Sequence, residues 1–110
     1  MSRNQSVQEA IEEMVHRIAE RFSPERIILF GSHARSEPSD DSDIDLLVLF
    51  AEVDNPRKRA AELYAELSEV NLPKDIVVST TERFERYKNV VNTVYWPAAR
   101  EGKVLYERAA

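Results

Sequence analysis

The sequence predicts an α+β domain in which a small mixed β-sheet of three to four strands is covered by helices. Two observations support this prediction. Segments with helical spacing and short β-branched runs follow one another in the order helix, strand, strand, helix, strand, helix, strand. A chain of 110 residues with 43% hydrophobic content also suits one hydrophobic core, so we expect residues 1–110 to form a single domain.

The first helix is predicted over residues 7–22, where apolar residues recur at spacings of three and four. Its apolar face should consist of Val7, Ile11, Met14, Ile18 and Phe22. Ser6 and Glu9 suit a capping box at the start of this helix, and Ser23-Pro24 should end it.

Two strands and a second helix are predicted next. Residues 26–30 (RIILF) indicate a buried strand that ends at Gly31, and residues 43–50 (DIDLLVLF) indicate another strand after a polar loop. An amphipathic helix should follow and end before Pro73. Its apolar face should consist of Ala60, Leu63, Tyr64, Leu67 and Val70.

The last part of the chain predicts a third strand at residues 75–79 (DIVVS). Ser79, with a glutamate three residues later, suggests a helix start. The apolar face of this segment should consist of Phe84, Tyr87, Val91, Val94 and Tyr95. Pro97 leaves open whether one helix or two follow, and we expect Gly102 to close the last helix before an edge strand at residues 103–107.

Composition excludes several classes of function. The chain has no cysteine, hence no disulfide framework and no thiolate metal site. Its formal charge of −5 argues against broad electrostatic binding to nucleic acid. No apolar run is long enough to span a bilayer, and no secretory signal is readable at the N-terminus. We expect a cytoplasmic protein with no membrane association.

The segment LFGSHARSEPSDDSDIDLLVLF places several acidic residues directly after a Gly-Ser turn. Asp43 and Asp45 are two apart in a predicted strand, so both side chains should lie on one face of the sheet. Carboxylates roughly 4 to 5 Å apart repel by a few kcal/mol at an effective dielectric constant of about 20. A divalent cation removes this repulsion, and Mg²⁺ prefers oxygen ligands. Asp40 and Asp41 precede the strand in a loop and are less well placed.

A third carboxylate would complete such a site. Asp75 opens the next predicted strand, and it reaches the first two if that strand lies beside residues 43–50. The alternative is an acid of no functional consequence at the start of a strand. For the motif as a whole, the alternative is a polar loop that leads into an exposed strand edge.

Gly31 and Ser32 stand where the first strand ends and a short helix is expected at SHAR. A glycine here would allow an anion to approach the backbone, and free N–H groups with the Ser32 hydroxyl suit phosphate oxygens. Arg35 would contact a triphosphate or pair with Asp45; the sequence favours neither.

Three segments in this order, GSHAR, SDIDLLV and DIVV, resemble the signature of the polymerase-beta-like nucleotidyltransferase superfamily. The chain is most similar to its minimal members, the MNT-domain proteins encoded beside a HEPN-domain partner. The resemblance extends over nearly the whole chain and includes the ending REGKVLYE. It implies the minimal nucleotidyltransferase fold.

The resemblance also implies a site and a reaction. Asp43, Asp45 and Asp75 would be the catalytic residues and would coordinate two Mg²⁺ ions. The nucleotide-binding residues would be Gly31, Ser32, Arg35 and Ser42. The implied reaction transfers AMP from ATP to an acceptor hydroxyl, with pyrophosphate leaving, and Asp75 would accept the hydroxyl proton.

Larger members of the superfamily carry an extra domain for the acceptor, and we expect no such domain in this chain. The resemblance implies that the acceptor is a tyrosine of a HEPN toxin and that this protein is its antitoxin. The alternative is a non-catalytic binding module that masks the active site of the toxin. Three mutually repelling acids favour the enzyme, because masking alone does not require them.

Overall fold

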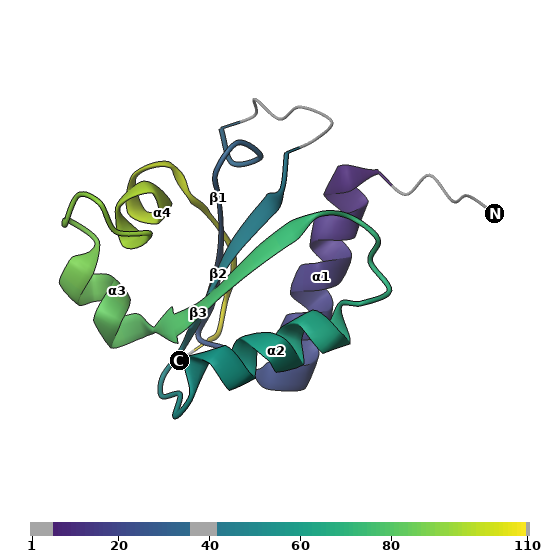
Figure 1. The fold of residues 1–110 in the computed structure, drawn as a ribbon, viewed down its shortest axis with the longest axis horizontal. Helices are drawn as coiled ribbons and strands as arrows, with labels where there is room; N and C mark the ends of the chain where they lie inside the picture. The colour runs from purple at the N-terminus through teal and green to yellow at the C-terminus, as the bar shows by residue number, and fades with distance from the viewer. Residues whose placement is uncertain (1–5, 36–41, 110) are drawn as a thin grey trace.

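The computed structural model describes residues 6–35 and 42–109 and confirms the predicted α+β class (Figure 1). Its elements are, in chain order, α1 (Val7–Phe22), β1 (Arg26–Phe30), β2 (Ile44–Phe50), α2 (Pro56–Glu66), β3 (Lys74–Thr80), α3 (Thr81–Tyr87), α4 (Tyr95–Glu101) and β4 (Lys103–Glu107). Asp40 and Asp41 lie outside the described residues.

The four strands form one mixed sheet in the order β3-β2-β1-β4. The central strand β1 pairs antiparallel with β2 and with β4, whereas β2 pairs parallel with β3. A parallel pair needs a crossover connection, and α2 lies in that connection. The strand that contains Asp75 lies beside β2, which meets the condition stated above for a third carboxylate, and β4 is an edge strand, as predicted.

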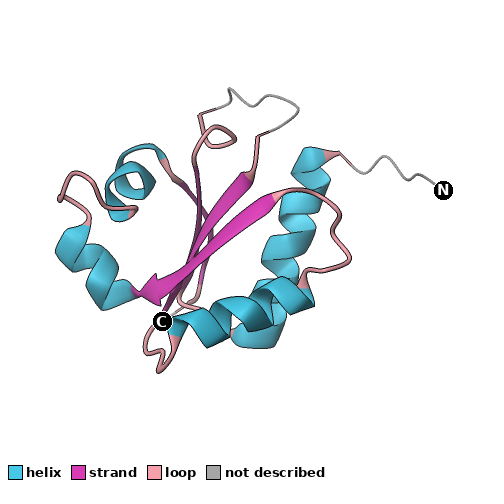
Figure 2. Cartoon of the chain, viewed as in Figure 1, coloured by secondary structure: helices cyan, strands magenta, loops and turns pink. Residues whose placement is uncertain are grey.

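Helices cover both faces of the sheet (Figure 2). Helices α1 and α2 pack on one face, where the buried side chains of β2 include Leu46 and Val48. Helices α3 and α4 pack on the other face, against Leu47 and Leu49. Because side chains alternate along a strand, Asp45 points to the same side as Leu47 and Leu49. The acidic site therefore belongs to the α3 and α4 face.

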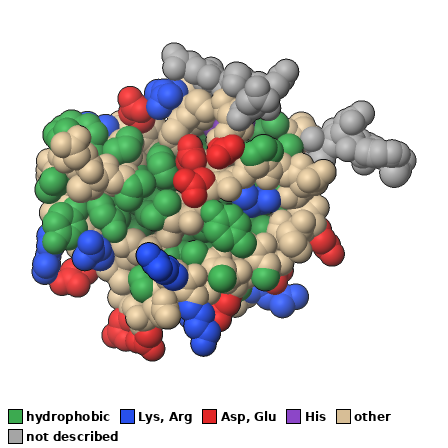
Figure 3. All heavy atoms as spheres, in the orientation of Figure 1, with side chains coloured by type: hydrophobic (Ala, Val, Ile, Leu, Met, Phe, Trp, Pro, Cys, Tyr) green, Lys and Arg blue, Asp and Glu red, His purple; other side chains and the backbone are tan. Residues whose placement is uncertain are grey.

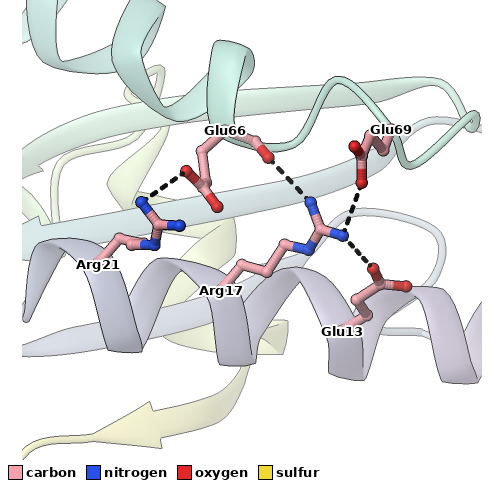
Figure 4. Close-up of polar contacts among 5 residues, drawn as sticks. All are labelled: Glu13, Arg17, Arg21, Glu66 and Glu69. Carbon is pink, nitrogen blue, oxygen red and sulfur yellow. Dashed lines mark hydrogen bonds and ion pairs between the residues drawn. The ribbon is translucent and has the colours of Figure 1, made fainter.

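An arginine fastens α1 to the end of α2 (Figure 4). Arg17 Nη1 donates to the Glu66 carbonyl at 3.2 Å, and Nη2 lies 2.8 Å from Glu13 Oε2 and 3.0 Å from Glu69 Oε1. Arg21 adds a longer ion pair to the Glu66 carboxylate at 3.8 Å. These contacts hold the two helices on the face opposite the acids.

The first predicted helix is confirmed, including its capping box: the Ser6 hydroxyl accepts from the Glu9 N–H and the Glu9 side chain accepts from the Ser6 N–H. Two other boundaries differ from the prediction. Helix α2 ends at Glu66 rather than near Pro73, although Leu67 and Val70 beyond it remain buried in the same core. The turn after Gly31 is hydrogen-bonded but is not a helix.

The region after β3 forms two helices rather than one. Ser79 was predicted to begin the first, but it lies buried in β3 with its hydroxyl 2.7 Å from that of Tyr95. Thr80 caps α3 instead, because its Oγ1 accepts from the Arg83 N–H at 3.1 Å. Gly102 closes α4, as expected. No helix in residues 6–35 and 42–109 has the length and apolar character needed to cross a membrane.

Candidate active site

The parallel pairing of β2 and β3 places two carboxylates side by side. Asp45 lies directly opposite Asp75 in the register of this pair, so the two side chains project from the same face of the sheet. Asp43 stands just before β2, two residues from Asp45, and is exposed, as is Asp75. Figure 3 shows acidic side chains gathered at one place on the surface, bordered by hydrophobic side chains.

The charges of these residues interact. Partial burial raises the pKa of the Asp45 carboxyl above its usual value, and the negative charges of Asp75 and Asp43 raise it further. His33 and Arg35 act in the opposite direction on this pKa, with smaller effects. Burial and the neighbouring negative charges thus both destabilise the ionised form of Asp45. A cation beside Asp45 would favour that ionised form.

The side chains of Asp43, Asp45 and Asp75 suit a hard divalent cation chemically, because all three offer carboxylate oxygens as ligands. The three carboxylates do not, however, converge on one point. Among the residues that the structure describes, no three His, Cys, Asp or Glu side chains stand close enough together to enclose a metal ion. Asp43 and Asp75 are exposed, so packing does not hold their side chains in place, and repulsion disfavours rotamers that bring the carboxylates together. The backbone register, rather than the side-chain rotamers, brings the acids together.

Gly31 lies close to the side chain of Asp45, whereas the close approach of an anion to its backbone stays a prediction. It follows Phe30, which pairs with Asp45 in the sheet, and its φ of 78° is one that glycine tolerates best. A Cβ at this position would overlap the Oδ2 atom of Asp45. The Gly31 carbonyl accepts from the N–H groups of Ala34 and Arg35 at 3.1 and 3.2 Å, which closes the turn. The Gly31 turn and Asp45 therefore lie against each other.

The other residues predicted to bind nucleotide lie around this turn. Ser32 and Ser42 are half-buried, at the turn and at the residue before Asp43. Arg35 is exposed, and its Nη1 lies 3.2 Å from Glu101 Oε1 at the end of α4. The turn is thus linked to α4 by an ion pair that the sequence did not predict.

Two residues in the site were not predicted to belong to it. His33 is half-buried, and its Nε2 lies 3.3 Å from the Ser42 carbonyl, which joins the turn to the start of β2. Tyr64, expected only on the apolar face of α2, has its hydroxyl 3.4 Å from Asp75 Oδ1. The sequence contains no signal for these contacts beyond the residue types themselves, a histidine and a tyrosine with polar groups that can form hydrogen bonds.

Replacement of Asp45 by asparagine should stabilise the protein in metal-free buffer. Folded Asp45 holds its proton more tightly than the unfolded chain does, so its ionisation destabilises the fold as pH rises through the unfolded and then the raised folded pKa. Asp45→Asn should therefore raise the melting temperature by a few degrees at neutral pH, with a smaller effect in acid. Asp54→Asn, at an exposed loop acid, is the control. A melting temperature lowered at neutral pH would show that ionised Asp45 does not destabilise the fold.

Replacement of Gly31 by alanine should disturb the site more than the backbone conformation alone requires. A left-handed alanine costs about 1–2 kcal/mol, and Gly31→Ala adds the overlap with Asp45. Asn92→Ala is a matched control, because Asn92 is exposed with a φ of 77°. Urea denaturation should show a greater loss for Gly31→Ala than for Asn92→Ala. Equal losses would mean that Gly31 does not pack against the carboxylate.

Comparison with known proteins gives one family. Residues 12–110 match the family described as polymerase beta, nucleotidyltransferase. No curated protein matches the sequence. A protein of Sulfolobus solfataricus solved as a candidate nucleotidyltransferase is similar, with 23% identity, a TM-score of 0.61, and coverage of 91% of this chain and 79% of that one.

Two further solved structures are toxin–antitoxin proteins. One contains AMP-PNP, with 22% identity, a TM-score of 0.55, and coverage of 88% of this chain and 73% of that one. The other is a tyrosine-to-alanine mutant of MntA-HpeT, with 22% identity, a TM-score of 0.59, and coverage of 89% of this chain and 72% of that one. All three structures share the fold of this chain. Because the family match extends over residues 12–110, the chain belongs to the polymerase beta nucleotidyltransferase family.

Proposed function

We propose that this protein transfers AMP from ATP to a tyrosine hydroxyl of a HEPN-domain toxin and so acts as its antitoxin. One observation supports the chemistry above all: Asp45 and Asp75 lie in register on neighbouring strands, with Asp43 two residues before Asp45 and Gly31 packed against Asp45. Acids that repel one another in this way are stabilised by a divalent cation, as a nucleotidyl transfer site requires.

In this proposal Asp43, Asp45 and Asp75 hold two Mg²⁺ ions. When bound, these ions neutralise charge on the phosphates and lower the pKa of the acceptor hydroxyl. The triphosphate lies at the turn after β1, where Gly31 gives access to the backbone and the Ser32 hydroxyl donates a hydrogen bond. Arg35 and Ser42 are the other proposed nucleotide contacts. The turn and the acids thus arrange the α-phosphate next to the carboxylates.

The reaction is an in-line displacement at the α-phosphorus of ATP. The acceptor oxygen forms a bond to this phosphorus, the bond between the phosphorus and the bridging oxygen to the β-phosphate breaks, and pyrophosphate leaves. Asp75 accepts the proton of the hydroxyl. We assign this role to Asp75 because it lies on the edge strand β3, at the side of the acids opposite β1 and its turn.

The partner is proposed from two sources. The motif resemblance is to minimal nucleotidyltransferases encoded beside HEPN proteins, and two of the similar structures are toxin–antitoxin proteins, one with AMP-PNP. The surface beside the acids also suits a protein partner, because hydrophobic side chains border them (Figure 3). A partner that docks there would present its hydroxyl to Asp75.

The test is transfer of label from α-labelled ATP to the HEPN protein encoded beside this one, in the presence of Mg²⁺. The wild-type protein should label the partner and suppress its toxicity. Asp43→Asn and Asp45→Asn should reduce labelling by about 100-fold or more, because each removes a carboxylate that holds the Mg²⁺ ions, and the charge of these ions stabilises the reacting phosphate. Asp54→Asn, at an exposed acid in the loop before α2, should label like the wild type.

The alternative, masking without catalysis, gives a different outcome. The partner would remain unlabelled with every variant, and Asp43→Asn would still suppress its toxicity. That result would contradict the proposed activity and would leave the protein a binding module. Label on the partner that persists unchanged in both aspartate variants would instead contradict the assignment of the site.

A further inference from the structure

The hydroxyl of Tyr64 joins α2 to the third acid of the proposed site. Tyr64 Oη accepts a hydrogen bond from the Ile76 N–H at 2.8 Å and donates to Asp75 Oδ1 at 3.4 Å. Asp75 and Ile76 are consecutive in β3, whereas Tyr64 lies on the preceding helix. One phenol oxygen therefore contacts both the backbone of the strand and the carboxylate that the strand presents.

The position of Tyr64 follows from the way α2 covers the edge of the sheet. β3 is an edge strand, so N–H groups on its outer side have no neighbouring strand to receive them. The Tyr64 hydroxyl receives the N–H of Ile76 there. Leu63 and Leu67, on either side of Tyr64, are fully buried in the core and fix α2 on the sheet. The phenol is thus held by the packing of its own helix.

The direction of the two hydrogen bonds determines what Tyr64 does to Asp75. A phenol has one proton to donate, and because its oxygen already accepts from Ile76, that proton is available to Asp75 Oδ1. The contact at 3.4 Å is longer than the usual O–H···O distance of about 2.7–2.8 Å, so this hydrogen bond is weak and gives Asp75 Oδ1 a preferred direction rather than a fixed one. Asp75 is otherwise exposed, and this contact limits the rotation of its side chain.

We propose that Tyr64 is a positioning residue that directs one oxygen of Asp75 toward α2 and leaves the other free on the side of Asp45. This inference rests on the proposed function, because it requires Asp75 to bind a divalent cation. Partners that orient a metal ligand in this way commonly change metal affinity when they are removed. Tyr64 itself does not touch the reacting groups.

The test measures Mn²⁺ binding to the isolated protein with AMP-PNP, by electron paramagnetic resonance of the free ion. Tyr64→Phe should weaken Mn²⁺ binding by about 10-fold, because Asp75 loses its orienting partner. Tyr64 is 39% exposed, so phenylalanine fits without leaving a buried cavity. Tyr106→Phe, at a half-buried tyrosine on β4, is the matched control and should bind Mn²⁺ like the wild type.

A double-mutant cycle separates positioning from a general effect on the fold. Asp75→Asn should weaken Mn²⁺ binding by itself, and Tyr64→Phe should cause no further loss in that background if Tyr64 acts through Asp75. Urea denaturation of each variant verifies that it is folded at the temperature of the measurement. Equal losses from Tyr64→Phe with and without Asp75 would overturn the inference.

The outcomes also separate this inference from the proposed function. If the wild-type protein binds no Mn²⁺ with AMP-PNP, the metal-dependent function fails and the role of Tyr64 fails with it. If the wild type binds Mn²⁺ and Tyr64→Phe binds it equally well, the proposed function stands and only the positioning role is overturned.

Discussion

The site depends on one structural constraint, the parallel pairing of β2 with β3 that sets Asp45 opposite Asp75. Side chains paired in this way project from the same face and cannot move far apart without breaking the ladder of the sheet. The core enforces the pairing, because Leu46, Val48 and Ile76 are buried on the other face. A shift of one residue in β3 would turn Asp75 into this core and Ile76 out of it. Hydrophobic burial therefore fixes two like charges beside each other.

The opposite side of Asp45 is constrained by the end of β1. Phe30 pairs with Asp45, and the chain then turns at Gly31 with a positive φ. Only a residue without a Cβ allows the carboxylate of Asp45 to lie against the turn. β1, β2 and β3 thus contribute the turn, the acid pair and the third acid in that spatial order. The strand register on one side of Asp45 and the Gly31 turn on the other therefore fix where this carboxylate lies.

Much of this arrangement follows from the sequence because it depends on periodicity. The spacing of Asp43 and Asp45 and the single helix between β2 and β3 made Asp75 the candidate third acid, and the pairing of β3 with β2 then decided that it lies beside Asp45. The contacts of Tyr64 and Ser79 were not predictable in this way. Each depends on how a helix docks: α2 brings Tyr64 to Asp75, and α4 brings Tyr95 to Ser79, which leaves Thr80 as the helix cap. Local propensity contains no information about such tertiary partners.

In the proposed function, these acids jointly hold a divalent cation beside a nucleotide at the Gly31 turn. Anomalous diffraction from crystals grown with Mn²⁺ and AMP-PNP tests it most directly, because the scattering locates the metal itself. We expect manganese peaks within coordination distance of Asp43, Asp45 and Asp75, with the phosphates at Gly31 and Ser32. Manganese bound elsewhere, or a nucleotide bound away from the turn with no metal at these carboxylates, would contradict the claim.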